Sequence, residues 1–255
     1  MSPELEEALI QRYPELLGPN AERALQQRRW SGEHRDGWYA LVDAVCEVLT
    51  VRAQEVGAWP TRAIQLGDEL EGTRFCAHLS TDEYVYESVS MAALHSRNLC
   101  EITGGPGRPT RAGNGWRGMM DWHGIMSPRI SLGRYGFEDG DTPPPPPLRV
   151  DETARYLTVK WPSTVRCVPA VPGGWLDLVS TLVGWIGERR RIDPDDGVVI
   201  EELREHEGEL VVRLRQLVIG DQGSVAFAKA MARRTDPMTG QTAAFGHSNN
   251  RGEFR

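Results

Sequence analysis

The sequence predicts an α+β fold made of two tandem copies of a helix–β-hairpin–helix unit, joined by a proline-rich linker. Residues 36–53 and 174–190 each contain a Gly-Trp pair followed by apolar residues at matching positions, 137 residues apart. Further along the chain the offset becomes 136, and turn glycines and apolar residues of the two halves still align. A run of prolines at 143–147 lies between the two halves.

The repeated stretch predicts the main core helix of each half. Six apolar positions after the Gly-Trp pair stay apolar in both halves: Leu41, Val42, Val45, Cys46, Val48 and Leu49, matched by Leu178, Val179, Leu182, Val183, Trp185 and Ile186. Their spacing places them on one broad face of a helix. We therefore expect Trp38, Trp175 and Trp185 in the core, and Asp36 as the cap of the first core helix.

Turn and capping signals predict the other elements of the first half. Ser2-Pro3-Glu4 indicates the start of an N-terminal helix, because a capping side chain precedes a proline and an acid. A short second helix is expected over residues 21–29. The core helix is followed by a hairpin, a helix and a loop: strands 63–69 and 73–79 around Glu71-Gly72, a helix over 82–98, and a glycine- and proline-rich loop at 103–109.

The second half is expected to repeat this order. It opens with two stretches that we interpret as strands, 156–161 and 164–168, because they are rich in β-branched and aromatic residues. The repeated elements follow: the helix led by Gly174-Trp175, strands 198–203 and 210–218 around Glu207-Gly208, and a helix over 224–234.

Composition describes a mildly acidic chain of 255 residues with a formal charge of −7. Nucleic acid is not the expected partner, since phosphate binding requires clustered lysine and arginine, and the short run Arg189–Arg191 is typical of a solvated helix end. The N-terminus lacks a signal-peptide pattern, and no apolar window is long enough to span a membrane. Cys46, Cys76, Cys100 and Cys167 are widely spaced, like reduced thiols, so we expect a cytoplasmic protein.

Four motifs in residues 10 to 125 resemble a group of short, largely uncharacterised bacterial and phage-encoded proteins. The first, Trp30-x-x-Glu33-x-x-Asp36-Gly37-Trp38, is similar to the Trp-Gly-Phe-Glu-Cys-Gly-Asp-Gly-Trp signature of that group. The other three follow in the same order: Leu66 to Phe75, Ser96 to Gly107, and Trp116 with Met120-Asp121-Trp122-His123. The resemblance implies a small zinc ribbon with one knuckle at Cys-x-x-Cys and another at Cys-x-x-His.

In this sequence the ribbon's ligand set is incomplete. Cys100 and His123 are retained, but Thr103 and Met120 stand at the other two ligand positions. Two ligands do not close a tetrahedral zinc site, so we expect no metal and no cofactor. The alternative is a retained metal with Asp121 or Cys76 recruited. The second half has Asp236 and Thr239 at the corresponding knuckle and therefore no thiolates there.

The expected domain boundaries follow from these observations. Residues 1–138 form the N-terminal repeat with its degenerate zinc-ribbon-like segment, 139–148 the linker, 149–242 the C-terminal repeat and 243–255 a loose tail. The proline run favours polyproline II, a semi-rigid spacer. Its alternative role is a ligand for a proline-binding domain.

No catalytic residue is expected, because the common nucleophile, phosphate-binding, metalloprotease and dinucleotide motifs are absent from the sequence. We expect a non-enzymatic protein-binding factor, an inhibitor or an immunity or anti-defence protein of phage or mobile-element origin, which occupies a partner's surface. Tryptophan is frequent at interface hot spots. The expected binding residues are tryptophans outside the repeated helices and a neighbouring methionine: Trp30, Trp59, Trp116, Met119, Trp122 and Trp161.

Two alternatives remain open at this stage. The first is a nucleic-acid-associated regulator derived from a zinc-ribbon protein, against which the acidic balance argues. The second is a hydrolase with a carboxylate site, because such sites leave no short motif. Partner identity and oligomeric state are not determined by these residues.

Overall fold

The computed structural model describes residues 1–17, 36–57, 64–69, 72–77, 82–99, 104–106, 118–120, 126–128, 150–192, 197–216 and 218–243. For residues 64–69, 72–77, 118–120, 126–128 and 150 only the backbone is described. The described residues form helices and three two-stranded antiparallel sheets, which confirms the predicted α+β class. The predicted helix over 21–29, the linker 139–148 and the tail beyond residue 243 lie outside them.

In the first half, a hairpin comes between the two longest helices in chain order. Its elements are α1 (Pro3–Arg12), α2 (Pro14–Leu17), η1 (Asp36–Trp38), α4 (Tyr39–Val56), β1 (Ile64–Glu69), β2 (Gly72–Ala77), α5 (Glu83–His95), η2 (Ser96–Asn98), β3 (Gly118–Met120) and β4 (Met126–Pro128). The hairpin pairs Glu69 with Gly72 at its turn end. Asp82 caps α5 by accepting a hydrogen bond from the Tyr84 amide at 2.9 Å.

The second half contains α6 (Val150–Lys160), η3 (Gly173–Trp175), α7 (Leu176–Ile192), β5 (Val199–His206), β6 (Glu209–Arg215) and α8 (Ile219–Arg233). β5 and β6 are antiparallel, with a register shift between Ile200 and Glu202. The segment before η3 runs parallel to β5 and forms bridges at Val165–Ile200 and Ala170–Arg204.

Some sequence-based expectations about these elements are wrong. Residues 164–168 do not form a strand, since Val165 makes only an isolated parallel bridge to Ile200. Ser2 is the N-cap residue of α1, but its side chain makes no cap hydrogen bond. Residues 156–161 do not form a strand, because 156–160 belong to α6, whose buried positions 153, 154 and 157 follow helical spacing. Asp36 does not cap α4, since Trp38 is the N-cap residue and makes no side-chain cap hydrogen bond. Instead, Asp36 Oδ1 accepts a hydrogen bond from the Ser2 amide at 2.6 Å and ties the chain start to η1.

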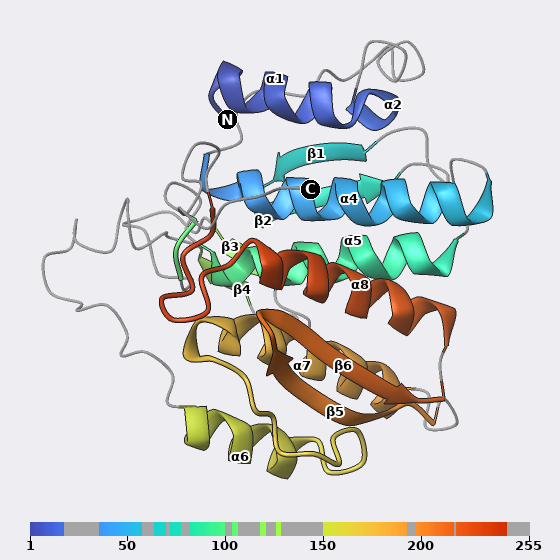
Figure 1. Cartoon of the computed structure of the whole chain (residues 1–255), viewed down its shortest axis with the longest axis vertical. Coiled ribbons are helices and arrows are strands. Elements are labelled where there is room, and N and C mark those ends of the chain that lie inside the picture. The colour runs from blue at the N-terminus through green and yellow to red at the C-terminus, as the bar shows by residue number, and fades with distance from the viewer. Residues whose placement is uncertain are drawn as a thin grey trace, which may run out of the picture.

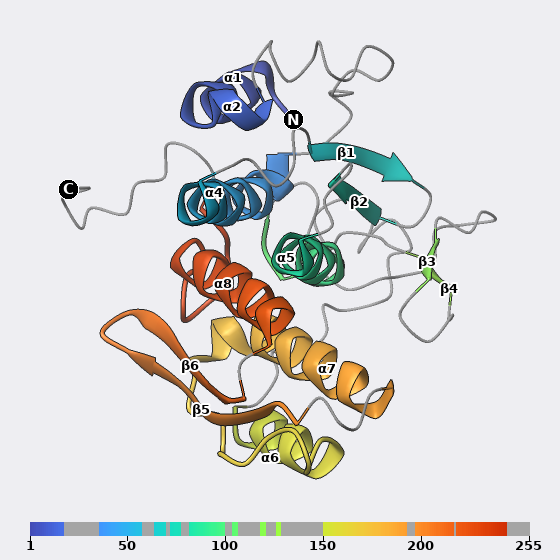
Figure 2. The ribbon, with the colours of Figure 1, turned by 90° about the vertical axis from the view of Figure 1, so that its right-hand side faces the viewer.

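The helices are stacked in layers along the long axis of the molecule. Figure 1 shows α1 and α2 at the top, followed by α4, α5 with α8, α7, and α6 at the bottom, and Figure 2 shows the same order from the side. Each hairpin packs against the last helix of its own half, β2 on α5 and β6 on α8. None of the described helices has the length and apolar character that crossing a membrane requires.

The core contains side chains from both halves. The described buried apolar residues form one contiguous cluster that includes Trp38 on the first half and Trp175 and Phe227 on the second. All twelve apolar positions predicted for the two core helices, Trp185 among them, are buried, as are Trp38 and Trp175, so this prediction is confirmed. Because interior side chains pack at near-crystalline density, a substitution in the core of one half alters the packing of the other half.

The element bounds of the two halves keep the offsets seen in the sequence. η1 and η3 start 137 positions apart (36 and 173), and α5 and α8 start 136 positions apart (83 and 219). The predicted turn at Glu207-Gly208 joins β5 to β6.

Candidate protein-binding surface

Helix α6 lies at one end of the molecule, with one face on α7 and the other outward. Its inward face is made of small and apolar residues: Thr153, Ala154 and Leu157. Tyr156 and Val159 are three positions apart, so they share a side of the helix, and they are 56% and 78% exposed. The side of α6 that faces away from α7 is therefore partly apolar.

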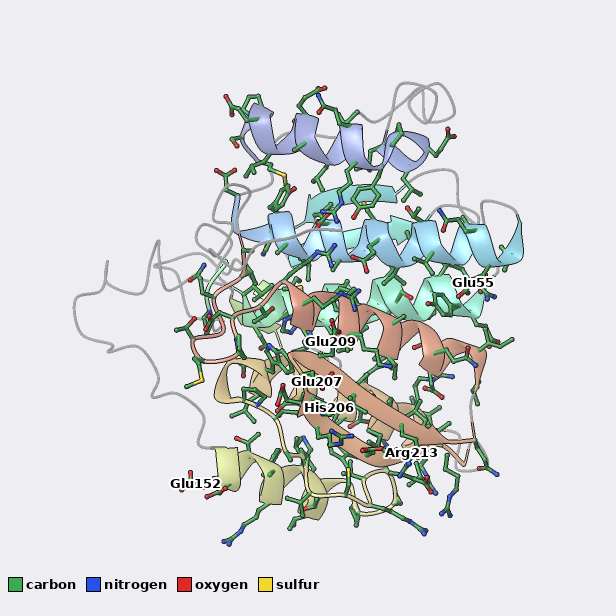
Figure 3. The ribbon with its side chains drawn as sticks, viewed as in Figure 1. Glu55, Glu152, His206, Glu207, Glu209 and Arg213 are labelled. Atoms are coloured by element: carbon green, nitrogen blue, oxygen red, sulfur yellow. The ribbon has the colours of Figure 1, made fainter. Side chains whose placement is uncertain are left out.

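The first turn of α6 carries charges that favour a helix. Asp151 and Glu152 place negative charge at the positive end of the helix dipole. Figure 3 labels Glu152 at this outer end, away from the body of the molecule.

Trp161 follows the last residue of α6 and joins the exposed face to the core. It is partly buried and packs against the core cluster. A side chain at Gly187 of α7 would overlap the Trp161 indole, so the ring lies directly on the α7 backbone. The Lys160 ammonium lies 5.4 Å from the ring centre of Tyr156 and 5.3 Å from that of Trp161. Lys160 thus joins the two aromatic rings through cation–π contacts.

The segment after α6 extends this surface. The Ile200 amide donates to the Thr164 carbonyl at 2.7 Å, and the Arg166 amide donates to the Ile200 carbonyl at 3.0 Å. This pairing leaves Val168 72% exposed. Both Figures 1 and 2 show the segment between α6 and η3 running beside α6. We define the α6 surface as Arg155, Tyr156, Val159, Lys160, Trp161, Arg166 and Val168.

The α6 surface carries positive charge. Arg155 and Arg166 are exposed, and within the described part of the chain neither forms an ion pair. The chain as a whole has a formal charge of −7. Cations beside exposed aromatic and apolar side chains fit a partner that presents carboxylates around an apolar centre.

A first buried ionic cluster ties α1, α4 and α8 together. Arg234 Nε lies 2.6 Å from Asp43 Oδ2, and Arg234 Nη2 lies 2.6 Å from Glu47 Oε2. The Tyr13 hydroxyl donates to Asp43 Oδ1 at 2.8 Å. Burial raises the pKa of Tyr13, and the charge of Asp43 raises it further, so this hydroxyl stays a donor. Arg233 also pairs with Glu47.

A second cluster lies between α5, α7 and α8. Arg189 Nη1 lies 3.2 Å from Glu87 Oε1 and 3.4 Å from Asp221 Oδ1. The Trp185 indole N–H donates to Glu87 Oε2, and the Ser224 hydroxyl is 3.5 Å from the same oxygen. Burial raises the pKa of Glu87 and outweighs the lowering by Arg189 and by the hydrogen bonds from Trp185 and Ser224.

These clusters hold the fold together. Asp221 is fully buried and Glu87 nearly so, and both contact an arginine of the same chain. A catalytic carboxylate must reach a substrate. The geometry therefore assigns Glu87 and Asp221 to the contact between the halves rather than to an exposed reaction site.

The β5–β6 turn carries two exposed glutamates, Glu207 and Glu209. Figure 3 shows His206, Glu207 and Glu209 together at this end of the hairpin, with Arg213 further along β6. Glu209 lies 3.5 Å from Arg233, and Glu205 accepts a hydrogen bond from the Gly208 amide at 2.6 Å. These acids are solvated and partly engaged in the turn itself.

The structure describes few of the sequence-predicted binding residues. Trp30, Trp59, Trp116 and Trp122 lie outside the described residues, and Met119 is described only as a backbone position in β3. Trp161 is the one whose side chain is placed. Tyr156 and Val159 were missed because residues 156–161 were interpreted as a strand, although the spacing of positions 153, 154 and 157 carries the helical signal.

The predicted ribbon ligands cannot be compared directly. Cys100, Thr103 and His123 lie outside the described residues, and within those residues no group of three potential metal ligands comes together. The corresponding knuckle of the second half is a hydrogen-bonded turn. Asp236 Oδ1 accepts from the amide and hydroxyl of Thr239 at 2.7 and 2.9 Å, and from the Met238 amide at 2.9 Å. These bonds lower the pKa of Asp236.

No protein-family model matches this chain, and neither a curated protein nor a solved structure matches it.

Proposed function

We propose that the protein is a non-enzymatic binding factor that occupies the surface of a partner protein through its α6 surface. The observation that carries this proposal is the group of exposed Tyr156, Val159 and Val168 beside Trp161, on a face that no described element covers. Tyrosine, tryptophan and arginine are the residue types that dominate interface hot spots, and all three are present here.

The partner we propose is a protein with an acidic and apolar contact surface, because exposed Arg155 and Lys160 lie on the same helix as Tyr156 and Val159, and Arg166 lies on the segment that follows it. Rim charges of this kind mainly speed association and select among partners, whereas the buried aromatic contacts supply most of the affinity.

The biological setting is also a proposal. The resemblance of residues 10 to 125 to bacterial and phage-encoded proteins supports an inhibitor, immunity or anti-defence role on phage or another mobile element. Cys46 and Cys167 are free thiols, which fits a reducing compartment such as the cytoplasm.

We further propose that the two halves are tandem copies of one helix–hairpin–helix unit, linked by residues 139–148. The offsets of 137 positions between η1 and η3 and of 136 positions between α5 and α8, which match those of the sequence, support this proposal. The shared turn position before Gly72 and Gly208 supports it as well, since each glycine starts or precedes the second strand of its hairpin.

The test of the binding proposal uses the full chain as bait in an extract of cells that carry the gene. A captured protein is identified, purified and titrated by calorimetry against the wild type, Tyr156→Ala and Tyr86→Ala. Tyr86 on α5 is 63% exposed and serves as the matched control. We expect Tyr156→Ala to weaken binding about tenfold or more while Tyr86→Ala has little effect. Equal affinities for the two variants, or capture of no protein, would contradict the proposal.

A further inference from the structure

The contact between α5 and α8 is reciprocal. A side chain at Gly223 of α8 would overlap the Tyr84 carbonyl oxygen of α5, and one at Gly220 would come within 2.9 Å of Glu87 Cγ. At the offset of 136, position 84 corresponds to 220 and position 87 to 223. Position 84 of the first half therefore contacts the counterpart of position 87, and position 87 contacts the counterpart of position 84.

The loops that follow α5 and α8 meet in the same reciprocal way. A side chain at Gly104 would overlap the Thr242 hydroxyl, and one at Gly240 would lie 2.8 Å from Pro106 Cγ. Positions 106 and 242 also correspond at the offset of 136, as do 104 and 240. The two glycines have nearly the same left-handed backbone, with φ of 72° and 73°.

Each of these loops closes on its own half with an equivalent bridge. Leu99 pairs with Pro106 in the first half, and Thr235 pairs with Thr242 in the second. The Thr242 amide then donates to the Gly104 carbonyl at 3.2 Å, across the boundary between the halves.

A third pair of contacts is nearly reciprocal but joins different residue types. Arg234, after α8, reaches Asp43 on α4. Its counterpart Asn98, after α5, donates to the Thr181 hydroxyl on α7 at 2.9 Å, one residue beyond Ser180, the counterpart of Asp43.

Contacts in which i meets j and j meets i are the mark of an isologous interface, the kind that joins the two subunits of a twofold dimer. We infer that the helix–hairpin–helix unit is self-complementary. The face of the unit that carries α5 in the first half, or α8 in the second, binds a second copy of the same unit. The chain is then a dimer made covalent by its linker. This inference rests on the tandem copies proposed above, and not on the proposed partner protein.

The test uses the full chain with a specific protease site replacing residues 143–147, cleaved after folding. We expect the two fragments to elute together on size exclusion and to unfold in one transition, whose midpoint rises with protein concentration as for a dimer. Elution as two separate species, or two independent unfolding transitions, would overturn the inference.

A matched pair of glycine variants makes the test specific to the reciprocal contact. Gly223→Ala places a methyl group against the α5 backbone, whereas Gly184→Ala on α7 has open space around it. In the cleaved protein we expect Gly223→Ala to raise the dissociation constant of the fragments about tenfold or more relative to Gly184→Ala. Equal dissociation constants would overturn the inference.

If Gly223→Ala does not fold, Gly220→Ala takes its place with a smaller expected increase, because it meets side-chain rather than backbone atoms. Neither readout involves the α6 surface, so a failure here leaves the binding proposal untouched, and the reverse also holds.

Discussion

In the tandem repeat that we propose, the contact of α4 with α8 is the counterpart of the contact of α5 with α7, yet the charges of the two contacts are balanced differently. Around α4 and α8, the carboxylates Asp43 and Glu47 meet Arg12, Arg233 and Arg234. Around α5 and α7, Glu87 and Asp221 both contact Arg189. One carboxylate pair thus contacts three arginines, whereas the other contacts a single arginine.

The difference shows which of two opposing effects decides the state of a buried carboxylate. Burial alone raises the pKa of both Glu47 and Glu87, because low polarity disfavours the charged form. For Glu47 the charges and hydrogen bonds of Arg234 and Arg233 outweigh burial, and its pKa is lowered. For Glu87 burial prevails over Arg189, and its pKa is raised.

The largest expected effect is that of Arg234→Gln. Arg234 is 11% exposed and contacts two carboxylates at 2.6 Å, so its loss removes the closest cation of Asp43 and leaves Glu47 paired with Arg233. Removing one partner of a buried ion pair typically costs about 3–5 kcal/mol. Denaturant unfolding of the variant should show this loss. A loss no larger than that of Arg213→Gln on the exposed face of β6 would contradict the importance given to the α4–α8 cluster.

The two clusters should respond to pH in opposite directions. Because the pKa of Glu47 is lowered, its stabilisation is present above pH 4.5, its ordinary value, and is lost as pH falls through the lowered value. Because the pKa of Glu87 is raised, its contribution is present below pH 4.5 and is lost as pH rises through the raised value.

Unfolding free energies measured across this pH range for the wild type, Glu47→Gln and Glu87→Gln check these directions. The stability lost relative to the wild type should increase with pH for Glu47→Gln and decrease with pH for Glu87→Gln. Parallel profiles for the two variants would show that the clusters do not differ as described.

A smaller effect is expected at Gly184, the counterpart of Glu47. No atom lies within 4 Å of a side chain built there, and the residue is inside α7. Gly184→Ala should therefore stabilise the protein by about 1 kcal/mol, the difference in helix propensity between the two residues. A rise in thermal midpoint checks this, and a fall would mean that the α5–α7 contact is closer than the structure indicates.

The smallest effect is expected for a double substitution that makes the α5–α7 contact resemble the α4–α8 contact. Gly184→Glu with Asn98→Arg places the Glu47–Arg234 pair at its counterpart positions. A double-mutant cycle should give a favourable coupling of about 0.5 kcal/mol, as for partly exposed ion pairs. A zero coupling at low salt would indicate that the two contacts differ in geometry as well as in residue type.

Much of the local structure could be predicted from residue spacing. The apolar stripes of α4 and α7, the start of α5 near Asp82 and the turn before Gly208 are all set by residues within a few positions of one another. The sequence of α6 favours a strand at Tyr156, Thr158 and Val159, whereas burial of Ala154 and Leu157 against α7 makes the segment helical.

The candidate surface could be predicted only in part. Trp161 was selected from the sequence as a tryptophan outside the repeated helices, and it does lie at the edge of the α6 surface. Tyr156 and Val159 became candidates only when the structure placed them outward, since exposure depends on which face of α6 meets α7.

The sequence by itself determined the α+β class, the two core helices and the order of helix, hairpin and helix in each half, because side-chain periodicity and turn chemistry act over a few neighbouring residues. Only the tertiary structure decided that Asp43 meets Arg234, 191 positions away, and that Glu87 meets Trp185, 98 positions away. Such pairings depend on how the helices of one half pack against those of the other, and that packing is a property of the whole core.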